Sequence, residues 1–203
     1  MCNLYSVTKG QQAIRDLFRI RRDSVGNLPI LPGIFPDYMA PVVRNHGDER
    51  ELTLMRWGFP PPPNLSKVPV TNIRNAASPY WRGWLKPEFR CLIPFTSFCE
   101  YADTQPRKSL WRPWTGIRGT KANPVEGEHR LFGFLTTSAN AEVHTVHPKA
   151  MPVILTTDEE FDLWLEGSPE EALRLQRPLP DGSLRVVATG PKEDAGPLDA
   201  GLG

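Results

Sequence analysis

The chain has 203 residues, of which 39% are hydrophobic, so it can bury one sizeable core and is short for two independent domains. Its 24 Lys and Arg residues against 23 Asp and Glu residues leave a formal net charge of +1. This balance excludes a global field that would concentrate polyanions at the surface, so any contact with nucleic acid must come from a local patch. No apolar run approaches the roughly 20 residues of a membrane span, and we expect a soluble, cytoplasmic protein.

Helix and strand signals alternate in the first third of the chain. Thr8 with Gln11 resembles a capping box and predicts a helix near 9–19. The apolar residues of this helix recur on one face: Ala13, Ile14, Leu17 and Phe18. Strands are predicted over Ala40–Arg44 and Glu51–Phe59, and the proline run 60–63 ends the second one because proline cannot donate to a ladder.

The rest of the chain carries further strand signals and two helix starts. Four buried strand segments, expected to share one sheet system, are predicted at 91–95, 97–101, 130–136 and 152–156. Thr157 and Ser168 each begin a short helix, and a last strand is predicted over Leu184–Ala188. The expected fold class is α+β: mixed, mainly antiparallel sheets with a barrel-like core and a few short helices. We expect one domain over 1–190 and a disordered tail over 191–203, which has little to bury.

The three cysteines, Cys2, Cys91 and Cys99, are an odd number without metal-ligand spacing, which predicts reduced thiols and no structural zinc. Cys2 has a special chemistry, since its small side chain permits removal of Met1. That removal leaves an α-amine and a thiol on adjacent carbons, and both groups have nucleophilic forms near neutral pH. Their natural electrophile is an aldehyde, which the pair can close into a thiazolidine ring. The alternative is that Cys2 is an ordinary residue of an edge strand.

Three polar motifs could share a site with such a nucleophile. Asn72 and Arg74 lie on one face of an extended segment, where the guanidinium suits a phosphate and the amide suits a reacting sugar. Glu100 ends an apolar run, where partial burial suits it to proton transfer. His147 and Lys149 precede a predicted strand. The alternatives are a polar turn, a salt-bridged glutamate and an ordinary loop histidine.

Five short motifs occur along the chain: Met1-Cys2, Met55-Arg-Trp-Gly58, Asn72-Ile-Arg74, Phe98-Cys-Glu-Tyr101 and His147 with Met151-Pro152. They have the same order as in the SRAP family, named for SOS response-associated peptidases, and the chain resembles that family from residue 2 to about 190. The resemblance implies a cytosolic protein that binds single-stranded DNA and crosslinks itself to abasic sites, shielding them from cleavage. No cofactor or metal is suggested by the sequence, since the Cys and His residues lack zinc spacing and no glycine-rich phosphate loop occurs, and no obligatory protein partner is inferred.

The resemblance also implies roles for the matching residues. Cys2 is similar to the family's nucleophile, Asn72 to the group that orients it, Glu100 to the general acid-base, and His147 to a residue that assists ring opening or adduct reversal. Among DNA contacts, Arg74 and Lys149 would hold phosphates, and Pro41 matches a position that lines the active cleft. Trp57 could offer apolar surface to an unstacked base, although burial in the core is the stronger expectation.

The sequence departs from the family pattern at several positions. Leu4 stands where many members carry a phosphate-binding arginine, and Ala76 replaces a glutamate that is common there. Three residues separate His147 from Met151 where well-known members have two, which leaves His144 as an alternative catalytic histidine. The segment from Tyr101 to Trp111 lacks a hairpin found in relatives, so two strands are expected to be missing, and either the sheet closes differently or the protein is impaired.

Two other functions remain open from the sequence. The first is a cysteine peptidase in which His147 activates Cys2 against a peptide or protein. The second is a DNA-binding module, or a relative impaired in crosslinking, that holds intact and abasic DNA equally well.

Overall fold

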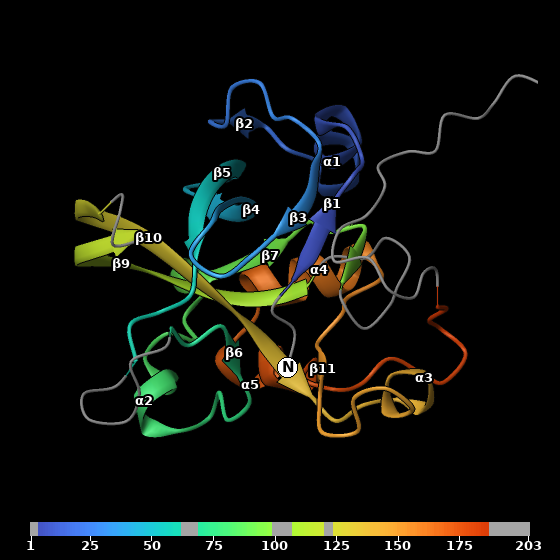
Figure 1. Cartoon of the computed structure of the whole chain (residues 1–203). Coiled ribbons are helices and arrows are strands. Elements are labelled where there is room, and N and C mark those ends of the chain that lie inside the picture. The colour runs from blue at the N-terminus through green and yellow to red at the C-terminus, as the bar shows by residue number, and fades with distance from the viewer. Residues whose placement is uncertain (1–3, 62–68, 99–106, 120–123, 187–203) are drawn as a thin grey trace, which may run out of the picture.

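The computed structural model describes residues 4–61, 69–98, 107–119 and 124–186, and it is an α+β structure as predicted (Figure 1). The elements in chain order are β1 (Tyr5–Val7), α1 (Gln11–Phe18), β2 (Arg22–Asp23), β3 (Leu31–Ile34), β4 (Met39–His46), β5 (Glu49–Trp57), β6 (Asn72–Ile73), α2 (Pro79–Arg82), the 3-10 helix η1 (Pro87–Phe89), β7 (Arg90–Ile93), β8 (Ser97–Phe98), β9 (Arg107–Gly119), β10 (Pro124–Thr137), α3 (Ala141–His144), β11 (Met151–Pro152), α4 (Asp158–Glu166) and α5 (Pro169–Arg174). Within these ranges no helix is long and apolar enough to cross a bilayer.

The strands form two sheets, so the expectation of one sheet system is wrong. A small antiparallel sheet has the order β3-β1-β8, and a larger one has the order β11-β10-β9-β7-β4-β5-β2 with β6 beside β10. Every residue of β1 is buried, although consecutive side chains point to opposite faces of the strand. The strand must therefore pack against a second layer as well as pair within its sheet. Because β10 also pairs with β5, the series β10-β9-β7-β4-β5 returns to its first strand, which gives the barrel-like core that was predicted.

Strand β10 has the most partners of the described strands. Its residues from Pro124 to Phe134 pair antiparallel with β9, and its last residues pair with β11. Leu131 and Phe132 pair parallel with β5, and Phe134 and Leu135 pair parallel with β6. All residues from Leu131 to Thr137 are buried, as a central strand covered on both faces requires. Gly133 allows close packing here, since a Cβ would lie 2.9 Å from Cε2 of Phe59.

Among the described strands, the large sheet is continuous where the sequence predicted that two strands are missing after Tyr101. Residues 99–106 lie outside the described ranges, and β9 begins at Arg107, pairing with β7 on one side and β10 on the other. The ladder groups of β7 and β10 therefore have partners, and the expected defect from two missing strands is not found. The sheet closes through a long β9–β10 hairpin.

The predicted helix starts are confirmed where a side chain caps the first turn of the helix. Thr157 accepts a hydrogen bond from the Glu160 N–H, and Ser168 with Glu171 forms the predicted capping box. The predicted capping box of Thr8 is wrong: Gly10 is the N-cap of α1, and the Thr8 hydroxyl donates to Thr96 instead. On α1 the core face consists of Ile14 and Phe18, whereas Ala13 and Leu17 are exposed.

Two strand predictions near the C-terminus need correction. The ladder predicted for 152–156 is limited to Met151 and Pro152, and Val153 adds one hydrogen bond to the Leu135 carbonyl. Residues 184–186 form no strand, and 187–188 lie outside the described ranges, as does the predicted tail 191–203. The one-domain prediction over 1–190 stays a prediction.

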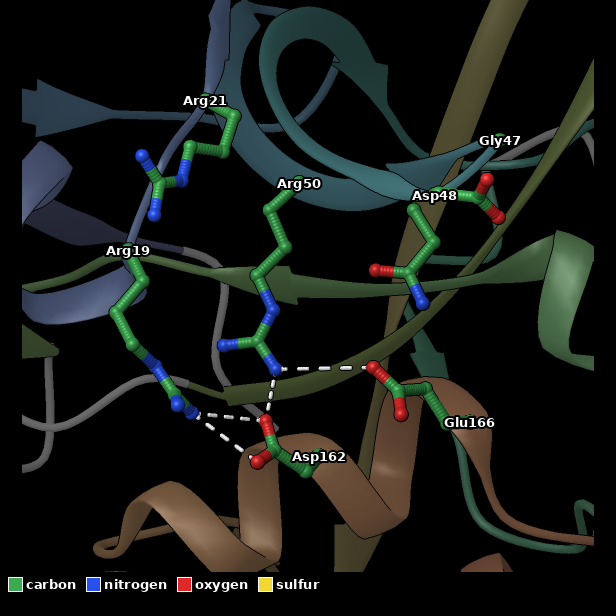
Figure 2. A pocket seen from close by; sticks show the side chains of 8 residues that line it. Arg19, Arg21, Gly47, Asp48, Arg50, Asp162 and Glu166 are labelled. Carbon is green, nitrogen blue, oxygen red and sulfur yellow. Dashed lines mark hydrogen bonds and ion pairs between the residues drawn. The ribbon is translucent and has the colours of Figure 1, made fainter.

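Helix α4 is held against the sheet by charge at two places. The guanidinium of Arg90, fully buried on β7, donates to the carbonyls of Trp164 and Gly167 at the C-terminal end of α4. Burial lowers the pKa of Arg90 to about 10, with Glu88 opposing the change. On the other side of α4, Asp162 accepts hydrogen bonds from Arg19 and Arg50, and Figure 2 shows both guanidinium groups pointing toward it.

The carboxylate of Asp162 gives a test of this second contact. Burial alone raises the Asp162 pKa, but the hydrogen bonds from Arg50 and Arg19 outweigh it, and the net pKa lies below the ordinary value. A lowered folded-state pKa contributes stability above the unfolded-state pKa, and the contribution is lost as pH falls through the folded-state pKa. The half-exposed side chain limits the contribution to at most about 1 kcal/mol.

We therefore predict that Asp162→Asn lowers the free energy of unfolding at pH 7, and that the difference from wild type shrinks toward pH 3. Urea unfolding at the two pH values measures this. Asp16→Asn is the matched control, because the exposed Asp16 carboxylate accepts a hydrogen bond from the Gln12 amide and, among the described residues, none from an arginine side chain. Equal losses at both pH values would contradict the prediction.

Candidate functional site

The small sheet brings together two segments that are far apart in the sequence. Tyr5 of β1 lies opposite Phe98 of β8, and Ser6 lies opposite Ser97, in antiparallel register. Thr96 strengthens the pairing, because its N–H and its hydroxyl both donate to the Ser6 carbonyl, at 2.8 and 3.1 Å. Two of the predicted site residues, Cys2 and Glu100, lie just beyond this ladder in the sequence and outside the described residues.

The Tyr5 ring joins the small sheet to the large one. It lies 5.3 Å from the ring of Phe134 on β10 and 5.2 Å from the ring of Trp57 on β5, in edge-to-face geometry that aromatic pairs favour. Phe134 in turn is the register partner of Asn72 on β6. The β1–β8 ladder, the middle of β10 and the Asn72 strand therefore meet around one aromatic cluster.

Asn72 occupies β6, a strand of two residues beside β10. Its side chain is half-buried, and its Nδ2 donates to the Thr71 hydroxyl at 2.8 Å. The Thr71 carbonyl accepts from the Phe134 N–H at 2.9 Å and from the Trp57 indole at 3.3 Å. The backbone that carries Asn72 is thus fixed from both sheet and core, which is what a group that orients a substrate requires.

Arg74 follows β6 and reaches across the end of β10. Strands β6 and β11 lie on opposite edges of β10, because Phe134 bonds to Thr71 and the next residue bonds to Val153, and consecutive residues direct their backbone groups to opposite edges. Figure 1 shows β6 and β11 on either side of this end of β10. The Arg74 Nη1 donates to the Thr137 carbonyl at 2.7 Å and to the Lys149 carbonyl at 3.2 Å.

The predicted histidine lies in the loop that Arg74 holds. The Nδ1 of His147 is 2.9 Å from the Ala150 carbonyl, and since a carbonyl can only accept, this contact assigns the proton to Nδ1. In the neutral ring, Nε2 is then the basic nitrogen. Lys149 is exposed beside it. His144, the alternative, is exposed at the end of α3 and lines a separate pocket with Arg177 and Asp181.

Two further predicted residues lie inside the sheet. Trp57 is 0% exposed and is enclosed by the aromatic cluster, with Phe132 stacked on its ring. An unstacked base has no access to it, so Trp57 takes the core position that was its alternative. Pro41 is buried in the middle of β4, opposite Leu54 of β5. Arg74 joins the segments that carry Asn72 and His147, since it follows Asn72 on one edge of β10 and its side chain donates to the Lys149 carbonyl. Trp57 and Pro41 are buried in the sheet instead.

Two pockets lined by described residues include none of these side chains. One, of about 510 Å³, is the charged hollow of Figure 2, where Arg19, Arg21 and Arg50 are balanced by Asp48, Asp162 and Glu166. With three charges of each sign, it favours neither anions nor cations. The described residues also hold no group of three His, Cys, Asp or Glu side chains that could bind a metal ion.

One residue at the end of β10 was missed by the sequence reasoning. Gln176 follows α5, and its Nε2 donates to the carbonyls of Arg74 and Thr136, at 2.8 and 3.0 Å. It stands about 100 residues from Arg74 in the sequence, in no recognisable motif, and no local signal could have placed it there.

The fold and this arrangement define a protein of the SRAP type. The model of the SOS response associated peptidase family matches residues 1–191, and the chain belongs to this family, whose name refers to the SOS response. Among curated proteins, none matches the chain.

Three solved structures that resemble this chain in fold come from two bacteria. A protein from Bordetella bronchiseptica has a TM-score of 0.66 at 22% identity, with 91% of this chain and 97% of that chain covered. A protein from Bacteroides thetaiotaomicron has a TM-score of 0.67 at 17% identity, with 91% and 90% covered. A phage-related protein from Bordetella bronchiseptica has a TM-score of 0.54 at 16% identity, with 86% and 87% covered. At these identities the likeness shows the fold.

The burial of Trp57 predicts a loss of stability when the ring is removed. Trp57→Ala empties a volume lined by Tyr5, Phe132 and Phe134, and should cost about 3–5 kcal/mol of unfolding free energy. Tyr80→Ala is the control, since Tyr80 is 43% exposed and should cost less than about 1 kcal/mol. Chemical denaturation measures both, and a Trp57→Ala protein of wild-type stability would show that the ring is not a core residue.

Proposed function

We propose that this protein captures the aldehyde of an abasic site in single-stranded DNA as a covalent adduct of Cys2, after removal of Met1. The observation that carries the proposal is the antiparallel pairing of Tyr5 with Phe98. Cys2 is three residues before Tyr5 and Glu100 is two residues after Phe98. Extended chain spans at most about 11 Å over three residues and about 7 Å over two, and this short separation from the pair supports the proposal that the two residues act at one site.

The proposed reaction has two bond-forming steps. The α-amine of Cys2 adds to the aldehyde carbon of the ring-opened deoxyribose, and loss of water gives an imine. The Cys2 thiolate then adds to the imine carbon, the nitrogen takes up a proton, and a five-membered thiazolidine results. The overall reaction releases one water molecule and involves no oxidation or reduction. No metal or cofactor is required.

The neighbouring groups have complementary roles in this proposal. Glu100 moves protons during ring opening and loss of water, which typically contributes about 10²–10⁴-fold in rate. Asn72 holds the opened sugar with its amide, and Nε2 of His147 exchanges a proton with the sugar oxygen. Exposed Arg74 and Lys149 contact flanking phosphates, which provides the local positive patch that the net charge of +1 does not.

The nucleophile is tested by changing two cysteines separately. Cys2→Ala should abolish a heat-stable band with abasic single-stranded DNA, and Cys91→Ala should retain it, because Cys91 is fully buried in β7. Denaturing gel electrophoresis measures the adduct, and intact-protein mass spectrometry first establishes that Met1 is absent. Loss of the adduct in folded Cys91→Ala, or an adduct formed by Cys2→Ala, would overturn the assignment.

Incubating the wild-type protein with abasic DNA and, separately, with peptides distinguishes the rival functions. Peptide release without a DNA adduct would identify a cysteine peptidase. Equal, wholly reversible binding of intact and abasic DNA would identify a binding module.

The two histidines provide an independent test of the site. His147→Ala should lower the rate of adduct formation or reversal by about 10²-fold, because a general acid-base is lost. His144→Ala should stay within about twofold, since its ring lines the pocket beside Arg177. Single-turnover kinetics at saturating abasic DNA measures both variants, and the opposite ranking would move the catalytic role to His144.

A further inference from the structure

On the edge of β10 that faces β6, the carbonyls beyond Leu135 need donors that no described strand supplies. The parallel pairing of β6 with β10 ends at Ile73 and Leu135. One position further, the carbonyls of Arg74 and Thr136 both accept from Nε2 of Gln176. Two acceptors cannot bond each other, and the two N–H groups of one amide can satisfy both. Gln176 thus continues the ladder as a bridge between the two strands.

The Gln176 bridge connects to the histidine loop through Arg74. The backbone of Arg74 is held by Gln176, and its side chain donates to Thr137 and Lys149 across the end of β10. Lys149 is two residues after His147, whose ring is tied to Ala150 in the same loop. A shift of the Arg74 backbone therefore moves the guanidinium, and with it the loop that carries His147.

The origin of the bridge gives it a fixed geometry. Gln176 follows the C-cap Leu175 of α5, and its own N–H bonds to the Leu173 carbonyl. The helix begins with the complete capping box of Ser168 and Glu171. Leu175 is buried in the core, so the side chain of Gln176 starts from an anchored backbone.

We propose that Gln176 is a positioning residue for the reaction at this site: it fixes Arg74, and through Arg74 the loop of His147, relative to Asn72. The inference rests on the proposed function for its kinetic consequence and on geometry for its structural one. Gln176 touches no reacting atom, and removing its amide should misplace His147 while DNA still binds. Small misplacements of a catalytic group are costly in rate, by as much as about 10²-fold for 1 Å.

The test compares three substitutions. Gln176→Met keeps the length and apolar volume of the side chain and removes both N–H donors. Gln176→Lys keeps donors that can reach carbonyl oxygens. Gln12→Met is the matched control on α1, where the Gln12 amide bonds the exposed Asp16.

Three quantities are measured for each variant: the melting temperature, the affinity for intact single-stranded DNA, and the rate of adduct formation at saturating abasic DNA. We expect Gln176→Met to lose about tenfold in rate and less in affinity, since Arg74 also contacts a phosphate, with Gln176→Lys recovering part of the loss. Gln12→Met should match wild type in both. A wild-type rate in folded Gln176→Met, or equal loss in the Met and Lys variants, would overturn the proposal.

A DNA-free measurement separates this inference from the proposed function. Nitrogen-15 NMR of the His147 ring and the Arg74 guanidinium should show changed ring signals and loss of the slowly exchanging guanidinium N–H in Gln176→Met. If wild type forms no adduct while these signals change, the proposed function fails and the positioning stands. If the signals stay as in wild type, Gln176 positions neither group, whatever the adduct assay gives.

Discussion

The hydrogen-bond ladder of the buried half of β10 is the constraint on which the rest of this structure depends. From Leu131 to Thr137 every residue of the strand is buried, so each backbone N–H and C=O in it needs a partner within the protein. Strands from four places in the sequence supply partners: β9, β5, β6 and β11. The same requirement that closes the barrel at β5 brings Asn72 to one edge of β10 and the segment after His147 to the other.

Beyond Leu135, side chains replace a strand on the edge of β10 that faces β6, while the other edge still pairs with β11. Gln176 donates to the Thr136 carbonyl, Arg74 donates to the Thr137 carbonyl, and the hydroxyl of Thr136 donates to Ile73. Because these donors are side chains, this part of the structure can present functional groups while its backbone polar atoms remain satisfied. The candidate site lies at this transition. Its polar residues are thus part of the closure of the fold as well as candidates for chemistry, and Arg74 serves both purposes by holding carbonyls with Nη1 and remaining exposed.

The helix starts and the central strands were accessible from sequence, and the sheet arrangement was not. Thr157 and Ser168 cap their helices because a capping bond joins groups three residues apart, a distance that the sequence records. Thr8 failed as a cap because Thr96, 88 residues away, binds its hydroxyl instead. The strand predicted over Leu184–Ala188 has the right composition in its first three residues but no neighbouring edge to pair with among the described strands. The contact that joins the two sheets likewise lies between Tyr5 and Phe134, which are 129 positions apart, so no local pattern encodes it.

By itself the sequence determined the α+β class, the order of the motifs and the residue types able to react with an aldehyde, because these follow from local spacing and from side-chain chemistry. It also predicted Asn72, Arg74, His147 and Lys149 as members of one site, and of these the structure joins Arg74 to the Lys149 carbonyl. Only the tertiary structure decided that Trp57 belongs to the core and that Gln176 bonds the backbone at the end of β10. It also showed that His144 lines a pocket that does not include His147. The physical reason is the same in each case: burial and hydrogen-bond partners are settled by segments remote in the chain, when the backbone of a central strand must be satisfied on both edges.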